Sequence, residues 1–199
     1  MTIKVLLADD HALVRTGFKL LLQASADIEV VAEAESGEEA YRLFVEQHPD
    51  VVIMDLAMPG IGGIEAVKKI MARDRNARIL ALSAHEDLSH PKRVLQAGAL
   101  GYLSKRGAPE ALIDAVRKTA EGRRVIDPAL AQKLAVQSLQ GNEATPVEQL
   151  SEREFAVFIQ LAQGASVARI AELLSLSPST VGTHLYNIKQ KLGLANQSE

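Results

Sequence analysis

Three aspartates in this sequence stand directly after short apolar runs, where carboxylates could handle a phosphoryl group. Asp9 and Asp10 follow the run 5–8, and Asp55 follows the run 51–54. Crowded carboxylates repel one another, so without a cation at least one of them should have a raised pKa. Mg²⁺ relieves such repulsion and commonly binds one or two carboxylates together with a phosphate. An aspartate beside that ion can attack phosphorus and form an aspartyl phosphate.

Ser83 and Lys105 supply the remaining groups of such a site. Ser83 follows the apolar run 79–82, where its hydroxyl could bond a phosphate oxygen, and Lys105 comes just beyond the run 101–103. A lysine ammonium there could offset charge that develops on the transferring group. Each residue alone has an ordinary explanation, because an aspartate pair after a strand is usually a solvated loop or a helix cap. The combination of five side chains favours the phosphoryl site.

The elements that must position these groups alternate along the first 120 residues. Apolar runs, typical of strands buried on both faces, occur at 5–8, 28–32, 51–54, 79–82 and 101–103. Helical periodicity follows each of them, at 12–23, 37–47, 63–72, 91–97 and 109–121. This alternation predicts a parallel sheet with right-handed crossovers and helices on both faces. Ligands of such sheets bind beyond the carboxyl ends of the strands, so the five side chains should converge there.

A different pattern begins after residue 121. Asp127 and Pro128 resemble an N-cap followed by proline at the first helical position, which predicts a helix over about 128–139. Residues 141–146 are polar and rich in helix breakers, so we expect a flexible linker. The whole segment 122–146 is predicted to separate two domains.

Three short helices are predicted beyond the linker. Ser151 and Glu154 have the spacing of a capping box, with Leu150 and Phe155 placed as a hydrophobic staple. The first helix should end at Gly164, and the others should cover 167–174 and 178–192 with a tight turn at 175–177. Such a turn between the second and third helices is typical of a helix-turn-helix.

The third of these helices has one apolar and one polar face. The apolar stripe has helical spacing and comprises Val181, Leu185, Ile188 and Leu192. The opposite face comprises Ser179, Thr183, Tyr186, Asn187 and Gln190, flanked by Gly182 and Lys189. Hydroxyls, amides and a lysine suit contacts to base edges and phosphates. Taken alone, the helix is better explained as an ordinary amphipathic helix with a solvated side, and the preceding helix and tight turn are what favour DNA binding.

Composition excludes several classes of protein. The 199 residues carry a net charge of −3 and include no cysteine, so disulfides and thiolate metal sites are excluded. No stretch approaches the ~18 apolar residues needed to cross a bilayer, and the N-terminal residues lack the apolar core of a secretory signal. We therefore expect a cytoplasmic protein without a membrane partner.

The charge of the C-terminal region weakens the case for DNA binding. From residue 147 onward there are four basic and five acidic residues: Arg153, Arg169, Lys189 and Lys191 against Glu148, Glu152, Glu154, Glu172 and Glu199. Neutralisation of phosphates by lysine and arginine usually dominates affinity for DNA. This count therefore argues against tight binding by a single copy, although residues 175–198 contain two lysines and no acid.

The segments ADDH (8–11), MDLAMPGIGGIE (54–65), LSAH (82–85) and GYLSK (101–105) resemble a receiver domain of the CheY type. The resemblance covers residues 3 to about 121 and implies a flavodoxin-like (βα)5 fold with strand order 2-1-3-4-5. It also implies that Asp55 is the phosphoacceptor. Mg²⁺ would be ligated by Asp10, Asp55 and the backbone carbonyl of Ala57, with Asp9 acting through water.

The same resemblance assigns further roles. Ser83 would be the switch hydroxyl, Lys105 the phosphate-binding lysine, and Tyr102 the aromatic residue that swings inward on activation. Ala57 and His85 occupy positions that tune phosphate lifetime in receivers, and we expect neither to position hydrolytic water well. The other histidines, among them His11, are expected to be surface or capping residues.

Residues 150–194 resemble the LuxR-type domain of NarL/FixJ response regulators. In that family the third helix enters the major groove. The usual contacts fall on Gly182, Thr183 and Tyr186, with Thr180 and Lys189 toward the DNA backbone. The sequence departs from the family at Gly182, where many relatives carry lysine or another polar residue. The family's fourth helix, which pairs two copies on DNA, is expected to be missing or incomplete here.

Together these features predict a response regulator of a two-component system. The expected domains are a receiver at 1–121, the linker at 122–146 and a helix-turn-helix domain at 147–199. A sensor histidine kinase would phosphorylate Asp55, with Mg²⁺ as cofactor, and the modified protein would bind promoter DNA as a homodimer.

Two alternatives remain to be weighed. An aspartyl-phosphate phosphatase would use a second acid two residues after its nucleophile, but that position is Ala57. We therefore expect no enzyme activity beyond the protein's own phosphorylation and dephosphorylation. The other alternative is a phosphorylation-dependent protein-interaction switch with weak or no DNA binding.

Overall fold

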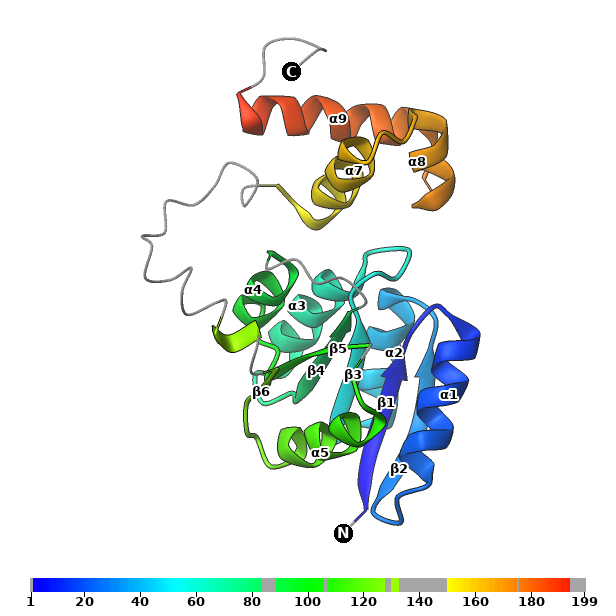
Figure 1. The fold of residues 1–199 in the computed structure, drawn as a ribbon, viewed down its shortest axis with the longest axis vertical. Coiled ribbons are helices and arrows are strands. Elements are labelled where there is room, and N and C mark those ends of the chain that lie inside the picture. Colours follow the sequence, from blue (N-terminus) through cyan, green and yellow to red (C-terminus); the bar gives the residue numbers. More distant parts are fainter. Residues whose placement is uncertain are drawn as a thin grey trace. The chain divides into compact units, whose positions relative to one another are not determined.

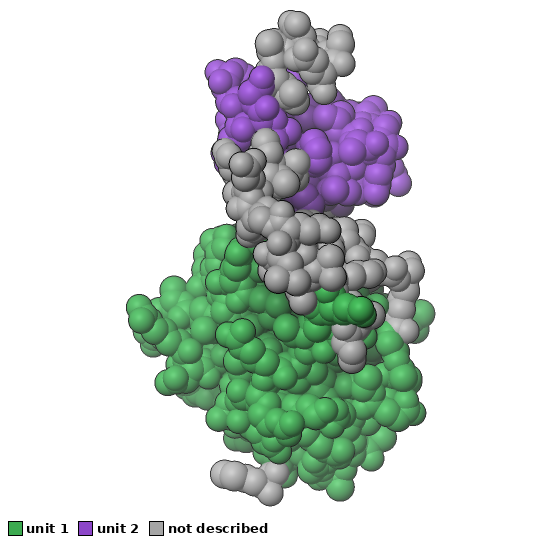
Figure 2. All heavy atoms as spheres, turned by 60° about the vertical axis from the view of Figure 1, so that its left-hand side comes forward, with its two compact units in different colours: residues 1–138 green, residues 139–199 purple. Residues whose placement is uncertain are grey.

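The computed structural model describes residues 2–83, 89–105, 107–127, 130–132, 150–174 and 176–193. The chain divides into two compact units, Met1–Ser138 and Leu139–Glu199, which Figure 2 shows in different colours. Among the helices in the described part of the chain, none combines the length and the apolarity needed to span a membrane.

The first unit is built on a parallel sheet. The described strands are β1 (Ile3–Ala8), β2 (Ile28–Ala34), β3 (Val51–Asp55), β4 (Ile79–Ser83), β5 (Gly101–Ser104) and β6 (Val125–Ile126). Their order in the sheet is β2-β1-β3-β4-β5-β6, and every neighbouring pair is parallel. This confirms the predicted order of the first five strands. The chain turns to opposite sides of β1 at β2 and β3, which places the topological switch point between β1 and β3.

Helices cover both faces of this sheet, as predicted (Figure 1). They are α1 (Ala12–Gln23), α2 (Gly37–Gln47), α3 (Gly63–Arg73), α4 (Ser89–Gln96) and α5 (Pro109–Ala120). Buried residues of α1 and α5 share one hydrophobic cluster with the sheet, and those of α2, α3 and α4 share another. α4 begins two residues before the predicted start at Pro91, because proline is tolerated anywhere in the first helical turn.

The strands are buried on both faces because alternate side chains point to opposite sides. In β1, Leu6 and Ala8 join the cluster beneath α2, α3 and α4, whereas Val5 and Leu7 join the cluster beneath α1 and α5. Apolar residues are therefore needed at almost every position of the inner strands, which explains the continuous apolar runs in the sequence.

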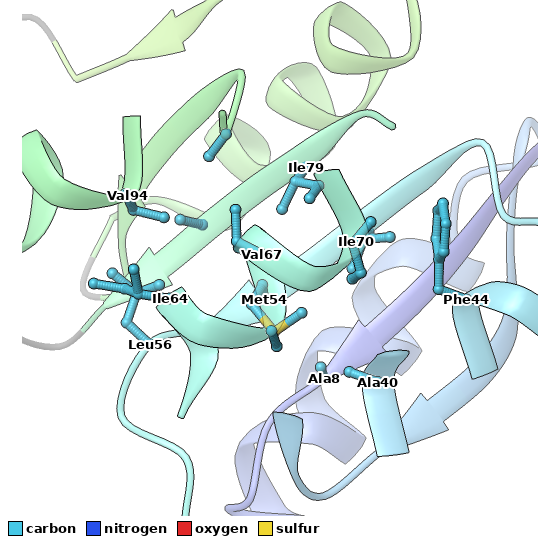
Figure 3. Packing of buried hydrophobic residues seen from close by; sticks show 14 of the residues in the cluster. Ala8, Ala40, Phe44, Met54, Leu56, Ile64, Val67, Ile70, Ile79 and Val94 are labelled. Carbon is cyan, nitrogen blue, oxygen red and sulfur yellow. The ribbon is translucent and has the colours of Figure 1, made fainter. Parts of the chain in front are cut away.

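One face of α3 provides much of the larger cluster. Ile64, Val67 and Ile70 recur at helical spacing and gather around Met54 of β3 and Ile79 of β4 (Figure 3). All five are at most 2% exposed. Packing of these side chains fixes α3 on the strand that carries Asp55.

The short strand β6 was not predicted, because its residues were assigned to the linker. Val125 pairs with Gly101 and Ile126 with Tyr102, so the sheet gains an edge strand beside β5. A Cβ atom at Gly101 would lie 2.8 Å from the carbonyl oxygen of Val125, and the absence of a side chain therefore permits this pairing. Of the helix predicted at 128–139, residues 130–132 are helical and the others lie outside the described residues.

The second unit contains α7 (Glu152–Ala162), α8 (Val167–Leu173) and α9 (Pro178–Leu192). They surround a cluster whose buried members are Leu150, Phe155, Val157, Ile170, Ala171, Val181 and Ile188. The predicted capping box is present, since Ser151 and Glu154 each accept a backbone N–H bond from the other. The predicted apolar stripe of α9 is also confirmed: Val181 and Ile188 are buried, and Leu185 and Leu192 pack against the cluster.

The first turn of α3 lies against the end of β3. Gly62 is the N-cap and has φ +77°, a conformation that favours glycine. The next residue, Gly63, has so little space that an added Cβ atom would overlap the carbonyl oxygen of Asp55. The two glycines therefore let a helix begin directly beside the phosphoacceptor candidate.

We predict that Gly63→Ala lowers the free energy of unfolding of the first unit by about 1–3 kcal/mol, because the methyl group must displace Asp55 or α3. Urea unfolding followed by circular dichroism measures the change. Gly17→Ala in α1 is the matched control: its Cβ atom would meet nothing within 4 Å, and alanine should raise stability by up to ~1 kcal/mol. Equal stability of the two variants would contradict the close approach at Gly63.

Candidate functional site

The predicted site residues converge at the carboxyl edge of the sheet. Asp55 and Ser83 are the last residues of β3 and β4, and Asp9 and Lys105 immediately follow β1 and β5. The strand register explains the convergence, because Ala8 pairs with Met54, Asp55 with Leu82, and Ser83 with Ser104. The four strands therefore end at nearly the same level.

A single ammonium group joins two buried carboxylates at this edge. The Nζ atom of Lys105 lies 2.6 Å from Oδ2 of Asp9 and 2.7 Å from Oδ2 of Asp55. Both aspartates are only 1% exposed. The contact with Asp9 has the alignment of a hydrogen bond, whereas Oδ2 of Asp55 has no aligned donor and is held by charge alone. The backbone N–H of Ala57 donates to the other oxygen, Oδ1, at 3.1 Å.

This environment shifts the pKa values of both Asp55 and Lys105. Burial raises the pKa of the Asp55 carboxyl, and the opposing effects of Lys105 and of the Ala57 N–H do not cancel that rise. Burial by itself would lower the pKa of the Lys105 ammonium, but its contacts with Asp55 and Asp9 outweigh burial and raise it. The expected rise in the pKa of one carboxyl is thus found at Asp55, although burial is its main cause and repulsion by Asp9 contributes least.

The acidic residues also fit a hard divalent cation. Asp9, Asp10, His11 and Asp55 each offer a ligand atom, and these atoms lie within 4.8 Å of one another. Oδ1 of Asp10 and Oδ2 of Asp55 are buried oxygens without a hydrogen bond. Buried acceptors left in this state are costly, and a cation beside them would compensate their negative charge.

His11 is a site residue that the sequence reasoning left out. Its Nδ1 lies 2.9 Å from Oδ1 of Asp10, although the side chain is 65% exposed. It is the N-cap residue of α1 but makes no side-chain cap bond, so the expected surface position is observed together with an unexpected contact. Its place directly after the two acids was the available signal.

Ser83 and Tyr102 are both buried, at 0% and 3% exposure. Tyr102 belongs to the hydrophobic cluster beneath α2, α3 and α4, so its ring already points into the protein. The expected swing of Tyr102 on activation stays a prediction. His85, which was expected to influence phosphate lifetime, lies outside the described residues.

The predicted DNA-contacting residues share one side of α9. Thr180, Gly182, Thr183 and Tyr186 are exposed, and Lys189 is half-buried. Tyr186 is 64% exposed, whereas Phe155 of the same unit is buried. The nearby Lys191 instead bonds the buried Glu154 at 2.6 Å and so fastens α9 to α7. Although burial would raise the pKa of Glu154, its bonds with Lys191 and Ser151 lower it.

Comparisons with known protein families agree with this arrangement. The family described as "Response regulator receiver domain" matches residues 5–117, and "Bacterial regulatory proteins, luxR family" matches residues 148–199. The chain belongs to the two-component response regulators of the LuxR type.

Relatives match this response regulator over nearly its whole length. It is 40% identical to response regulator GacA of Pseudomonas aeruginosa over 198 residues, which cover 99% of this chain and 92% of that protein. It is also 40% identical to response regulator UvrY of Escherichia coli, with 99% and 91% covered.

Solved structures are similar as well. A LuxR-family two-component response regulator from Aurantimonas sp. SI85-9A1 is 40% identical with a TM-score of 0.67, over 70% of this chain and 99% of that one. RcsB from Salmonella enterica serovar Typhimurium, bound to promoter rprA in the presence of the phosphomimetic BeF3⁻, is 26% identical with a TM-score of 0.65, over 99% and 95%.

The raised pKa of Asp55 predicts a pH-dependent cost in stability without metal. A folded-state pKa above the unfolded value of about 4 means that ionisation of Asp55 destabilises the fold as pH rises. Asp55→Asn should therefore be more stable than the wild type at pH 7 in EDTA. This advantage should shrink as the pH falls through the folded-state pKa and vanish below about pH 4.

Thermal or urea unfolding at several pH values measures this difference. Asp114→Asn is the control, because Asp114 is an exposed aspartate paired with Lys118 and such pairs contribute little. A stability advantage of Asp55→Asn that persists unchanged to low pH would contradict a buried, proton-binding Asp55.

Proposed function

We propose that Asp55 accepts a phosphoryl group from a sensor histidine kinase, or from a small acyl phosphate, and that this modification controls DNA binding by α9. The observation that carries the proposal is the buried Oδ2 of Asp55, which has no aligned donor and lies 2.7 Å from the Lys105 ammonium. An oxygen with free lone pairs beside a fixed positive charge suits attack on phosphorus.

Each neighbouring group has a role in this transfer. Oδ2 of Asp55 forms the new P–O bond while the bond to the donor breaks, and the donor group leaves with the electron pair. The Ala57 N–H holds Oδ1, which leaves Oδ2 as the attacking atom. Lys105 offsets negative charge on the phosphoryl oxygens, and the Ser83 hydroxyl would bond one of them.

Asp10 and Asp55 would hold Mg²⁺ with the backbone carbonyl of Ala57, while Asp9 would act through water. When bound, Mg²⁺ would neutralise charge on the carboxylates and on the phosphoryl oxygens. The fit of the acidic group to a divalent cation supports this assignment. His11, beside Asp10, adds an imidazole at the exposed side of the same group.

We infer that the output is promoter binding by a phosphorylation-dependent homodimer. The positions that would face base edges are those of Gly182, Thr183 and Tyr186, of which only Thr183 and Tyr186 carry a side chain. Thr180 and Lys189 would contact phosphates. RcsB, with promoter DNA bound in the presence of a phosphomimetic, supports this part of the proposal. The residues from 147 onward are not basic, so two copies on two half-sites would supply the affinity that one lacks.

Phosphorylation itself gives the first test. Incubation with acetyl phosphate and Mg²⁺ should add the mass of one phosphoryl group to the wild type and none to Asp55→Asn. Asp50→Asn is the matched control: Asp50 immediately precedes β3 at its other end, where it accepts a bond from the Lys4 N–H, and it should be modified normally. Modification of Asp55→Asn to the wild-type extent would contradict the assignment.

DNA binding gives the second test, by mobility shift with promoter fragments. Acetyl phosphate should increase binding of the wild type but not of Asp55→Asn. With the wild type phosphorylated, Tyr186→Ala should reduce promoter affinity by about 1–3 kcal/mol and relax sequence preference. Lys189→Ala should weaken binding to all sequences and lower the salt dependence by about one ion.

The control for both helix variants is Lys68→Ala on α3, which removes an exposed lysine paired with Glu65 and should leave DNA binding unchanged. If phosphorylated wild type retarded no promoter fragment, the second unit would instead serve a protein partner. If Tyr186→Ala and Lys68→Ala changed promoter affinity equally, the assignment of α9 as the recognition helix would be wrong.

A further inference from the structure

Arg15 on α1 is a buried cation outside the group of residues that would touch the phosphoryl group. Among the described residues it is the one arginine or lysine in the buried class, at 9% exposure. Burial of a guanidinium is costly unless several acceptors compensate it. Its contacts therefore indicate what this position is for.

Those contacts join the end of β1 to the end of β2. Nη1 donates to the backbone carbonyl of Asp9 at 2.6 Å, in a buried hydrogen bond. Nη2 donates to Oε1 of Glu35 at 2.6 Å, and Nε lies 3.4 Å from Oε2 of Glu33. The planar guanidinium thus spans acceptors on two neighbouring segments, which a lysine ammonium cannot do in the same geometry.

The Asp9 carbonyl belongs to the peptide unit that leads into Asp10. Because that unit is planar, fixing the carbonyl also fixes the direction in which Asp10 leaves the strand. The N–H of Asp9 is held from the other side by the carbonyl of Ala34 at 3.0 Å. Oδ1 of Asp10, in contrast, has no aligned hydrogen bond and contacts only the exposed imidazole of His11 among the described residues, so the backbone that carries Asp10 largely sets its position.

We propose that Arg15 is a positioning residue, which acts through the Asp9 carbonyl to orient the carboxylates of Asp9 and Asp10 for a divalent cation. This inference rests on the proposed function of the acidic group. Partners that orient metal ligands typically contribute 10–100-fold to metal affinity. Arg15 therefore strengthens cation binding even though it is itself positively charged.

The direction in which Mg²⁺ affinity changes when Arg15 is replaced distinguishes a positioning role from a purely electrostatic one. Removing a nearby positive charge should by itself strengthen Mg²⁺ binding, because the repulsion between that charge and the cation is lost. Loss of positioning has the opposite result. In the full chain, Mg²⁺ affinity measured by calorimetry should fall about tenfold in Arg15→Met and in Arg15→Lys.

Lys19→Met is the matched control. Lys19 lies one turn further along α1 and bonds Oε1 of Glu33 at 2.5 Å, so it shares a carboxylate partner with Arg15. None of its described contacts is with Asp9. Its substitution should leave Mg²⁺ affinity within about twofold of the wild type, because this half-buried pair is partly screened by solvent and the bond from Arg15 to the Asp9 carbonyl stays in place.

Unfolding in EDTA measures the purely structural contribution of Arg15 separately. If Arg15→Met does not fold, Arg15→Lys and Glu35→Ala carry the test, because Glu35→Ala releases Nη2 and leaves the Asp9 contact in place. Glu35→Ala should weaken Mg²⁺ binding less than Arg15→Lys. At saturating Mg²⁺ the phosphorylation rate of Arg15→Lys should approach that of the wild type, as expected for an affinity defect.

Folded Arg15 variants that bind Mg²⁺ as tightly as the wild type, or more tightly, would overturn the inference while the proposed function stands. A wild type that binds no Mg²⁺ and accepts no phosphoryl group would overturn both. A loss of stability in EDTA with unchanged Mg²⁺ affinity would reduce Arg15 to a structural role.

Discussion

The buried contact of one ammonium with two carboxylates is the constraint on which the rest of the first unit depends. Asp9 and Asp55 are almost fully buried, and buried charges are tolerated only when they are compensated. Lys105 provides part of that compensation. With Asp10 included, three carboxyl groups lie near one ammonium, an arrangement that suits a divalent cation. The raised pKa of the Asp55 carboxyl reflects its burial, which the contact with Lys105 does not offset.

The fold brings these groups together because the parallel strands β1, β3, β4 and β5 end at nearly the same level of the sheet. The segments that follow β1, β2 and β3 are joined to one another by hydrogen bonds. Arg15 links the segment after β1 to that after β2, and Oε1 of Glu38 accepts the N–H of Ile61 from the loop after β3 at 2.9 Å. Next to that bond, Gly60 has φ +77° and leaves room for the Glu38 carboxylate. The site is therefore held by side-chain hydrogen bonds among the segments that follow β1, β2 and β3, as well as by its own charges.

The second unit is held together mainly by apolar packing, with few charged contacts. Its three helices are held by a small apolar cluster, and the buried Glu154 both caps α7 and receives Lys191 from α9. The orientation of α9 is therefore fixed within the unit, while its opposite side presents Thr183 and Tyr186 to solvent. Under the function we propose, this surface carries little net charge, so DNA binding would depend on the pairing of two copies and could be controlled by phosphorylation of the receiver.

The sequence alone determined the strands, their helices and the residues that meet at the sheet edge. Those signals are local: apolar runs, helical periodicity, and caps such as Ser151 with Glu154. The bounds of α1, α2 and α9 were predicted to the residue, and in α2 and α9 the breakers Pro49 and Gly193 mark the C-terminal ends.

Only the tertiary structure decided features that depend on contacts between distant segments. β6 has two residues, too few for any periodicity, and exists because β5 offers an unpaired edge beside Gly101. The contact of His11 with Asp10, the burial of Tyr102 and the bond from Arg15 to the Asp9 carbonyl are likewise not encoded in spacing. Sequence can name the ionisable groups of a site, but burial and the neighbours brought by folding set their pKa values and their geometry.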